Sequence, residues 1–471
     1  MEIKFLNNKI ENIQADLEIV LLKKHKLLKA NDRFIQKNKL YVKIADFKHY
    51  TITETLSNTI KYIHKTNKYK SIKLSLYGIS DKKIQALIDG LILGGYDFTK
   101  YQSKTKKLKL KDIFIAKENF INSDNFIDYE EIKLLINKCI IVNNNINITR
   151  DMINSVAEDT TPIKLSKWIE KELEDSNIKC IVKDEDYIQK ELPAFYDISK
   201  GSVNNPRLVH LKYNENKGYK KVVLIGKGVT FDTGGMSLKP SNYMYDMRLD
   251  KAGAVTIFGI IKTINDLKLP IEVHSILGLS ENMISNNAYK PGDVIKTRKG
   301  KTIEIMNTDA EGRILLADLF EYSQDKIKKI DYIFDYATLT GSVVGAIGQY
   351  SAGLIGHNNK LKIKMIKISK KTDEEYVDLP FNRYFFENSY QSAIADFSNI
   401  PTSSIGGGTI MGGVFIDNFL EKKYKNKWLH IDIAGVSFIK SSWKYHQYGA
   451  TGFGVKSSMY MIKKLISNSS V

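Results

Sequence analysis

The segment KVVLIGKGVTFDTGGMSLKPS, residues 221–241, joins a short apolar run to a glycine-rich loop with polar side chains. The run KVVLIG is typical of a buried strand, and Lys227, Asp232 and Lys239 lie in the loop after it. A phosphate-binding loop does not fit, because Phe231 stands where a third glycine is needed and no Gly-Lys-Ser/Thr closes the loop. An ordinary turn with solvated lysines remains the alternative for this segment taken alone.

Apolar runs of the same kind recur after residue 156 and alternate with helical patterns. The predicted strands are IEVHSILGL (271–279), DYIFDYATL (331–339) and WLHIDIAG (428–435), and the predicted helices are AGAVTIFGIIKTINDL (252–267) and RILLADLFEYSQDKI (313–327). Strands that alternate with helices predict an α/β fold with a mainly parallel sheet that is covered on both faces. Ligands of such sheets bind at the carboxyl ends of the strands, which is where the polar clusters of this chain lie.

The amino-terminal part of the chain has a different pattern. It alternates short runs such as IKLSLYGI (72–79) with helical stretches such as DKKIQALIDGLIL (81–93) and has no recognisable catalytic motif. A mostly helical stretch follows and ends at EDTTP, where Thr161 fits an N-cap and Pro162 the first helical position. We therefore expect an α/β amino-terminal domain (1–125), a linking helix (126–155) and a larger α/β/α domain (156–471).

The composition is that of a globular protein. Apolar residues make up 43% and charged residues 26% of the 471 residues, which excludes disorder as the dominant state. No apolar run reaches about 18 residues, and the amino terminus lacks the apolar segment of a secretory signal. Cys139 and Cys180 are too few for a disulfide framework or a thiolate zinc site. A reducing cytoplasm is the expected location.

The net charge is strongly positive and unevenly distributed. The chain has 71 basic and 53 acidic residues, a net charge of +18, and residues 1–140 hold 27 basic and 16 acidic residues, a net of +11. A basic region can attract nucleic acid. The lysines are scattered, however, and the whole chain is rich in Lys, Asn and Ile, which favours a solvated surface without a specific partner. Nucleic acid is kept as the weaker alternative partner.

Two carboxylates are closely spaced in MNTDAEGRILLAD, residues 306–318. Asp309 and Glu311 would lie about 200° apart on a helix but would point the same way on an extended chain. Because helical periodicity begins only near Arg313, we expect both carboxylates on extended backbone entering a helix, facing one site. The alternative is a helix start that is enriched in acids because of the macrodipole.

A fourth carboxylate completes a candidate metal site. Asp250 opens a helical pattern in MRLDKAGAV, although an N-cap role is the alternative. Asp232, Asp250, Asp309 and Glu311 would together place four negative charges at strand ends, at a high cost in repulsion and desolvation. Two divalent cations would cancel this charge, and an oxygen-rich site without histidine suits Mn²⁺, Mg²⁺ or Zn²⁺.

Other catalytic chemistries have little support. His274 and His430 lie inside strand-like runs, where a hydrogen-bonded core histidine is the favoured interpretation. No G-x-S-x-G motif supports a serine nucleophile, and both cysteines lie far from the clusters in sequence.

GKGVTFDTGG followed by NTDAEGR resembles the leucyl aminopeptidase family, the two-metal cytosol aminopeptidases also called M17 or PepA-type. The resemblance extends in the same order over essentially all of residues 149–471. It includes SLKPS (237–241), ENM with AYKPGDV (281–294), DYATLTGS (335–342), HIDIAG (430–435) and GATGFGV (449–455). Residues 1–125 match little, as expected for the variable amino-terminal domain of the family, and 156–471 would be the catalytic metallopeptidase domain.

The resemblance implies a role for each matching residue. Asp232 and Glu311 would bridge two metal ions, Asp309 would bind one of them, and Lys227 and Asp250 would bind the other. Lys239 would polarise the scissile carbonyl, and Arg313 would hold a bicarbonate ion that serves as the general base. The substrate would be bound by Met247, Thr338, Leu339, Thr340 and Gly341.

The implied activity is that of a leucyl aminopeptidase, a metallo-exopeptidase hydrolase. It would release single amino-terminal residues, with Leu or Met preferred, from peptides with a free amino terminus through metal-activated water. Mn²⁺, Zn²⁺ or Mg²⁺ would be the ions, and the family implies a homohexamer. The alternative function is a basic nucleic-acid-binding protein on the same scaffold. Tyr243 and Tyr245 replace smaller residues of the family and would narrow the entrance of the site.

Overall fold

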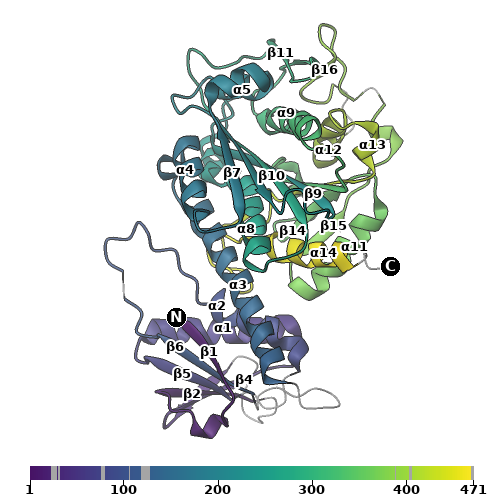
Figure 1. Cartoon of the computed structure of the whole chain (residues 1–471). Coiled ribbons are helices and arrows are strands. Elements are labelled where there is room, and N and C mark those ends of the chain that lie inside the picture. Colours follow the sequence, from purple (N-terminus) through teal and green to yellow (C-terminus); the bar gives the residue numbers. More distant parts are fainter. Residues whose placement is uncertain are drawn as a thin grey trace. The chain divides into compact units, whose positions relative to one another are not determined.

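The computed structural model describes residues 1–22, 29, 32–75, 80–105, 107–117, 128–387, 389–402 and 406–467 (Figure 1). The chain divides into two compact units, here called unit 1 (Met1–Asn147 with Ser441–Tyr448) and unit 2 (Ile148–Lys440 with Gly449–Val471). The run predicted over 72–79 lies outside the described residues from 76 on, as do residues 126 and 127 of the predicted linking helix.

Unit 1 is built on a six-stranded sheet in the order β1-β6-β5-β2-β4-β3. Neighbouring strands are parallel except for β3 and β4. The strands are β1 Glu2–Leu6, β2 Leu17–Leu22, β3 Arg33–Gln36, β4 Lys39–Lys43, β5 Ser71–Ser75 and β6 Asp112–Ala116. The helices are α1 His49–Thr66, α2 Ile84–Ile92 and α3 Tyr129–Asn154, which continues into unit 2. Buried side chains of the sheet and of α1 and α2 form one apolar core, which contains Leu56 and Ile72.

Unit 2 is built on an eight-stranded sheet in the order β15-β14-β17-β13-β9-β10-β8-β7. Its strands are β7 Ile178–Lys183, β8 Arg207–Tyr213, β9 Lys221–Asp232, β10 Glu272–Asn282, β13 Tyr332–Ala337, β14 Ser351–Ile355, β15 Glu375–Asp378 and β17 Trp428–Asp432. The central strands β17, β13, β9 and β10 run parallel, and antiparallel pairs occur toward the edges. The prediction of an α/β fold with a mainly parallel sheet is confirmed.

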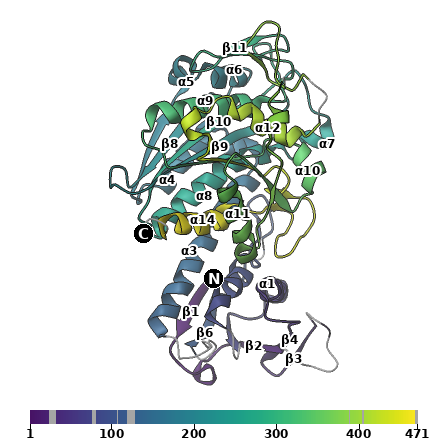
Figure 2. The same ribbon diagram turned by 90° about the vertical axis from the view of Figure 1, so that its right-hand side faces the viewer.

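Helices cover both faces of this sheet (Figure 2). One layer contains α4 Pro162–Glu172, α8 Ala252–Asp266, α11 Asn359–Thr372 and α14 Val455–Ser467. The other contains α5 Glu185–Glu191, α6 Pro193–Ser199, α9 Glu311–Lys326 and α12 Gly408–Asp417. The Thr161 hydroxyl accepts a hydrogen bond from Lys164 N at the start of α4, and Pro162 is its first residue, so the predicted cap is confirmed.

Shorter elements complete the chain. They are α7 Ser241–Met244, α10 Ser342–Ile347, α13 Lys422–Lys425, the strands β11 Val294–Lys296, β12 Thr302–Glu304, β16 Phe397–Ser398, β18 Phe438–Ile439 and β19 Gly449–Ala450, and the 3-10 helices η1 Ile10–Asn12, η2 Asp81–Lys83, η4 Ala157–Thr160, η5 Met247–Lys251 and η6 Arg383–Phe385. None of the helices in the described ranges combines the length and the apolar character needed to cross a bilayer.

Strand β9 is twice as long as the run KVVLIG predicts, because its glycines serve packing and not a turn. A Cβ at Gly226 would lie 2.6 Å from the Cα of Ala254 in α8, and one at Gly228 would lie 2.6 Å from the Gly278 carbonyl oxygen in β10. Glycine therefore lets the helix and the neighbouring strand approach the backbone of β9. As a result, Lys227 and Asp232 lie on the strand itself, and only Lys239 lies in the loop.

Helix α9 begins earlier than the sequence pattern predicts. Glu311 is its first residue, after Ala310 at the cap position. The expectation that Glu311 lies on extended backbone is therefore wrong, whereas Asp309 does precede the helix. An acidic side chain in the first turn is favoured by the helix macrodipole, which explains why the helix can start there.

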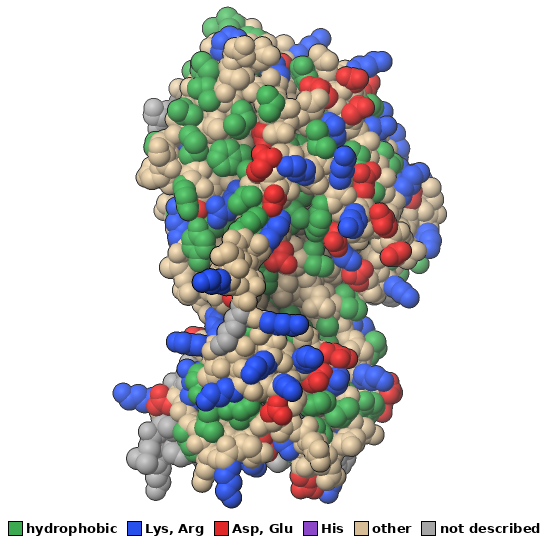
Figure 3. Space-filling model, turned by 90° about the vertical axis from the view of Figure 1, so that its left-hand side faces the viewer, with side chains coloured by type: hydrophobic (Ala, Val, Ile, Leu, Met, Phe, Trp, Pro, Cys, Tyr) green, Lys and Arg blue, Asp and Glu red, His purple; other side chains and the backbone are tan. Residues whose placement is uncertain are grey.

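Charges of both signs are mixed on the surface. On the face shown in Figure 3, Lys and Arg side chains are spread between Asp and Glu side chains. This distribution agrees with the interpretation that the lysines of this face are solvated.

Candidate metal centre

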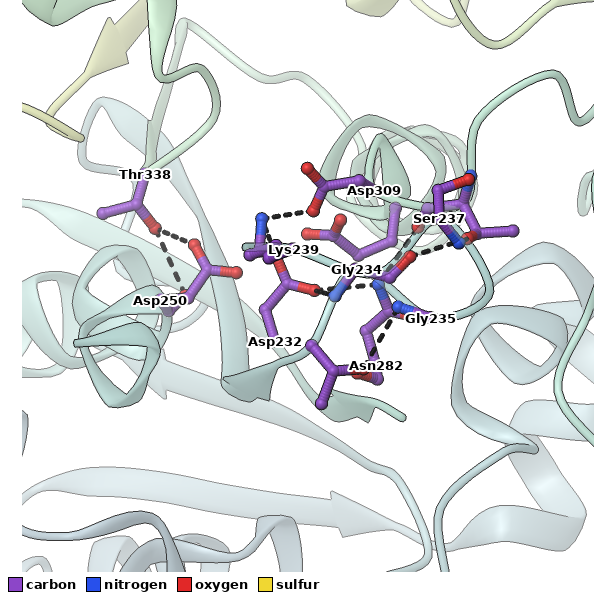
Figure 4. Close-up of polar contacts among 12 residues, drawn as sticks. Asp232, Gly234, Gly235, Ser237, Lys239, Asp250, Asn282, Asp309 and Thr338 are labelled. Carbon is purple, nitrogen blue, oxygen red and sulfur yellow. Dashed lines mark hydrogen bonds and ion pairs between the residues drawn. The ribbon is translucent and has the colours of Figure 1, made fainter. Parts of the chain in front are cut away.

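The carboxyl ends of β9 and β13, the 3-10 helix η5 and the start of α9 border one cavity of about 560 Å³. Most of the residues that the sequence singled out line it. They are Lys227, Asp232, Lys239, Met247, Asp250, Asp309, Glu311, Thr338, Leu339 and Gly341. Figure 4 shows several of these side chains pointing toward one another. Segments far apart in the sequence thus supply one site.

Three carboxylates have the arrangement of metal ligands. Asp232, Asp309 and Glu311 each offer an oxygen atom, and these atoms all lie within 4.8 Å of one another. Asp232 ends β9, while Asp309 and Glu311 flank the start of α9, so the strand and the helix together fix the group.

Lys227 joins Asp250 to this group. Its Nζ atom lies 2.7 Å from the Asp250 carboxylate, 2.9 Å from Glu311 Oε1 and 3.0 Å from the Thr338 carbonyl oxygen. The Thr338 hydroxyl also donates a hydrogen bond of 2.5 Å to Asp250 Oδ1 (Figure 4). All five proposed metal ligands are therefore linked through Lys227 or lie in the carboxylate group.

Lys239 occupies the other side of the group. Its Nζ atom lies 2.9 Å from Asp232 Oδ2 and forms an ion pair with Asp309 Oδ1. Its side chain is 14% exposed, so the ammonium group borders the cavity instead of extending into solvent.

The electrostatics of the site are dominated by buried charge. Burial opposes the charged form of Lys227, but Asp250, Glu311 and Asp232 outweigh it and raise the pKa of Lys227. Burial, together with the charge of Asp232, raises the pKa of Glu311 and of Asp309. Four carboxylates face two ammonium groups, so two negative charges are left without a cation, and added positive charge would be favoured.

The residues fit divalent cations. Glu311 Oε2 is buried and has no hydrogen-bond partner within the described part of the chain, which is costly for a carboxylate oxygen unless something else binds it. The donor set of carboxylates and one amine suits hard or borderline metals. Lysine ligates a metal only as the neutral amine. The carboxylates raise the pKa of Lys227, and a nearby dication would lower it again.

Gly312 makes room for Lys227. A Cβ at this position would lie 2.6 Å from Cε and 2.9 Å from Nζ of Lys227. The glycine of NTDAEGR therefore has a packing reason that the sequence did not reveal. It allows the first turn of α9 to pass directly beside the lysine.

Arg313 and Thr340 are not among the residues that line the cavity. Arg313 Nη1 donates hydrogen bonds to the Tyr390 hydroxyl (3.2 Å) and the Asn399 carbonyl (2.9 Å), and its Nε and Nη2 atoms have no hydrogen-bond partner among the described residues. The Thr340 hydroxyl donates to Asp432 Oδ2 (2.7 Å), and the same carboxylate accepts from Leu339 N.

Two asparagines that sequence reasoning missed support the site. Asn399 Oδ1 accepts hydrogen bonds from Met306 N (2.8 Å) and Asn307 N (3.2 Å), just ahead of Asp309. Asn282 Nδ2 donates to Asp232 Oδ1 at 2.8 Å. The ENM motif was a signal for Asn282, whereas nothing in the sequence near Asn399 indicated its role.

The two core histidines differ. His274 has hydrogen bonds at both ring nitrogens, with His210 and with Glu272, as predicted. His430 Nδ1 bonds to Asp335 Oδ2, but its Nε2 has no hydrogen-bond partner among the described residues.

The fold and the carboxylate group define an α/β protein with a candidate metal centre at the carboxyl ends of its strands. Residues 147–459 match the sequence profile of the cytosol aminopeptidase family, catalytic domain (M17). The chain belongs to this family, a family of metallopeptidases, and its fold and family support an aminopeptidase, a hydrolase of peptides.

Curated relatives agree over nearly the whole chain. A probable cytosol aminopeptidase of Campylobacter jejuni subsp. jejuni is 38% identical over 486 residues, 99% of both chains. Another, of Wolinella succinogenes, is 36% identical over 439 residues, 93% of this chain and 89% of the relative. The nucleic-acid-binding alternative finds no support in these relatives.

The fold also occurs in solved structures. The bottromycin maturation enzyme BotP in complex with Mn superposes with a TM-score of 0.85 at 24% identity, covering 96% of this chain and 100% of that chain. A second structure of BotP gives a TM-score of 0.83 at the same identity. At this level of identity the likeness concerns the fold.

Proposed function

We propose that the protein is a cytoplasmic two-metal leucyl aminopeptidase that releases single residues from the free amino terminus of peptides. The observation that carries the proposal is the group of Asp232, Asp309 and Glu311 beside the Lys227–Asp250 pair. The buried Glu311 Oε2 accepts no hydrogen bond from any of the described residues. Peptides are the substrates, and a homohexamer is the proposed assembly.

The residues proposed to hold two ions are Lys227, Asp232, Asp250, Asp309 and Glu311. Asp232 and Glu311 would be shared between the ions, which are Mn²⁺, Zn²⁺ or Mg²⁺. When bound, such ions supply Lewis acidity and lower the pKa of a coordinated water. Lys227 must give up its proton to take part, so binding of the ions would release a proton from its amine.

Lys239 and Arg313 are the proposed catalytic residues. The Lys239 ammonium borders the cavity and would stabilise negative charge on the carbonyl oxygen of the scissile bond. Arg313 leaves Nε and Nη2 for a bicarbonate ion, while Tyr390 and Asn399 hold Nη1 in place. The bicarbonate would accept the proton of the attacking water.

The substrate's first side chain would enter the apolar part of the cavity. Met247, Leu339, Val344, Ala434 and Phe438 contribute this wall, and such a surface favours Leu or Met over charged side chains. The backbone of Thr338, Leu339, Thr340 and Gly341 would orient the peptide, although the Thr340 hydroxyl itself bonds to Asp432.

A comparison of Leu-amide with acetyl-Leu-amide tests the function. We expect the chain loaded with Mn²⁺ to cleave Leu-amide and not acetyl-Leu-amide, because an acetyl group removes the amine that orients the substrate. Removal of the metal with a chelator should abolish the cleavage. Equal cleavage of both amides would contradict an aminopeptidase, and full activity after metal removal would contradict the metal mechanism.

A further inference from the structure

Asn282 and Asp232 are brought face to face by an irregularity in the sheet. Strands β9 and β10 pair regularly up to Val229 and Ser280, but the next pair is Phe231 with Glu281, so β9 carries one extra residue, Thr230. The extra residue shifts the register by one, so that Asp232, and not Phe231, becomes the partner of Asn282. Asp232 therefore lies opposite Asn282 at the carboxyl ends of both strands.

The orientation of the Asn282 amide is fixed by its neighbours. Its Nδ2 atom donates to Asp232 Oδ1 (2.8 Å) and to the Thr308 carbonyl (3.0 Å), both of which are acceptors. Turning the amide over would place oxygen against both of them. Asn282 is 0% exposed, and its own Oδ1 has no hydrogen-bond partner in the ranges that the structure describes. The side chain therefore satisfies the two acceptors while its own oxygen stays without a donor.

The two oxygens of Asp232 consequently have different surroundings. Oδ1 also accepts a hydrogen bond from Gly234 N at 2.8 Å, the contact of an Asx turn in which an aspartate side chain bonds the backbone two residues further on. Oδ2 instead faces Lys239 Nζ at 2.9 Å, on the side of the cavity. Figure 4 shows Asp232 between Lys239 on one side and Gly234 and Asn282 on the other.

We infer that Asn282 is a positioning residue that, with Gly234 N, occupies Asp232 Oδ1 and leaves Oδ2 as the oxygen that binds metal. The inference rests on the proposed metal centre and assigns a role to the ENM motif. A carboxylate with both oxygens free can rotate about its Cβ–Cγ bond, whereas one held at Oδ1 presents Oδ2 in a single direction. Partners of this kind change metal affinity by about 10–100-fold when removed.

The test measures Mn²⁺ affinity of the full chain by competition with a chelator, starting from the loaded protein. The variants are Asn282→Ala and the similarly sized, apolar Asn282→Leu. The matched control is Tyr289→Phe, because the Tyr289 hydroxyl donates the other hydrogen bond to the Thr308 carbonyl (2.6 Å) and makes none to Asp232. We expect about tenfold or greater loss of affinity in both Asn282 variants and less than threefold loss in the control.

The inference is overturned if the Asn282 variants retain Mn²⁺ affinity within threefold, or if Tyr289→Phe loses as much as they do, since Asn282 would then act only on the 306–309 loop. A crystal structure of the unaltered chain with Mn²⁺ tests the same point without any variant. Coordination through Asp232 Oδ2, with Oδ1 kept by Asn282, supports the inference, and coordination through Oδ1 overturns it. Failure of the unaltered chain to bind Mn²⁺ would instead remove the proposed metal centre itself.

Discussion

At the scale of single residues, Gly312 lowers the stability of helix α9 but leaves room for the side chain of Lys227. An alanine is favoured over glycine within a helix by up to about 1 kcal/mol. At position 312, however, its Cβ would fall within 3 Å of the end of the Lys227 side chain. The flexible lysine, and not the backbone, would have to move.

We therefore expect Gly312→Ala to leave the free energy of unfolding unchanged or raised by up to about 1 kcal/mol, while the metal content and the activity fall. Urea unfolding of the metal-free variant measures the first effect, and elemental analysis measures the second. A variant that keeps both metal ions and full activity would show that Lys227 is not a ligand in the position seen here.

Measurements of metal content and activity should distinguish the proposed metal ligands from the proposed catalytic residues. Asp309→Ala and Glu311→Ala remove proposed ligands, so we expect them to lose metal as well as activity by elemental analysis and an amide assay. Full metal occupancy in either variant would contradict its place among the ligands.

Lys239→Ala and Arg313→Ala provide the contrast. Both side chains are proposed to act on the substrate and the base, so these variants should keep their metal and lose about 10²–10³-fold in kcat, the scale for one oriented electrostatic group. Loss of metal from either variant would mean that the residue belongs to the ligand shell.

The candidate ligands could be named from sequence because their motifs are short and local. Asp232, Asp309 and Glu311 meet within 4.8 Å as the clusters at strand ends suggested. Asn399 could not be found this way, because it acts on Met306 and Asn307 from more than 90 residues away. Such long-range hydrogen bonds leave no periodic or local trace in the chain.

At the scale of elements, β8 and β10 share a buried chain of hydrogen bonds. The Tyr322 hydroxyl lies 3.3 Å from His210 Nδ1, His210 Nε2 lies 3.1 Å from His274 Nδ1, and His274 Nε2 lies 3.0 Å from Glu272 Oε1. All these bonds can form with both rings neutral. His274 Nε2–H then donates to Glu272, His210 Nε2–H donates to His274 Nδ1, and His210 Nδ1 accepts from the Tyr322 hydroxyl. Burial, with the neighbouring His274 and Lys212, lowers the pKa of His210 to about 3, and burial also lowers the pKa of His274.

This series of hydrogen bonds predicts that unit 2 loses stability in mild acid. Between pH 6.5 and about 3 the unfolded chain binds a proton at residue 210 that the folded chain does not, so the free energy of unfolding falls by up to about 1.4 kcal/mol per pH unit. His210→Gln should reduce the loss between pH 7 and pH 5 in urea unfolding. An unchanged pH dependence in the variant would contradict the neutral state of the buried ring.

Element types were predictable from sequence, but two boundaries at the site were not. The alternation of apolar runs and helical patterns identified β9, β10, β13, β17, α8 and α9. The sequence pattern predicts that β9 ends at Gly226, because glycine is typical of turns. In the structure this glycine lies within the strand and lets α8 pack closely against it. The extra residue at Thr230 likewise leaves no signal, because a bulge depends on the register with β10.

At the scale of the whole molecule, the two units have separate apolar cores. The core of unit 1 includes Leu56 on α1, and that of unit 2 includes Ile225 on β9. The segment Ser441–Tyr448 returns to unit 1 late in the chain, which no local pattern indicated. Every proposed metal ligand lies in unit 2, so we expect the centre to form without side chains of unit 1.

Separate cores predict two thermal transitions that respond to different changes. Leu56 is 0% exposed, so Leu56→Ala should cost unit 1 about 2–5 kcal/mol and lower the temperature of one transition in calorimetry of the full chain. Mn²⁺ at about 100 times its Kd should stabilise unit 2 by about 2.7 kcal/mol and raise the temperature of the other transition, because all the proposed ligands lie in that unit. Helix α3 continues across the boundary between the units, so a small shift of the second transition in each case is expected.

Leu56→Ala should leave the metal content unchanged. If Leu56→Ala and Mn²⁺ move the same transition by similar amounts, the units unfold together, and the centre depends on unit 1 through the cooperativity of the whole chain.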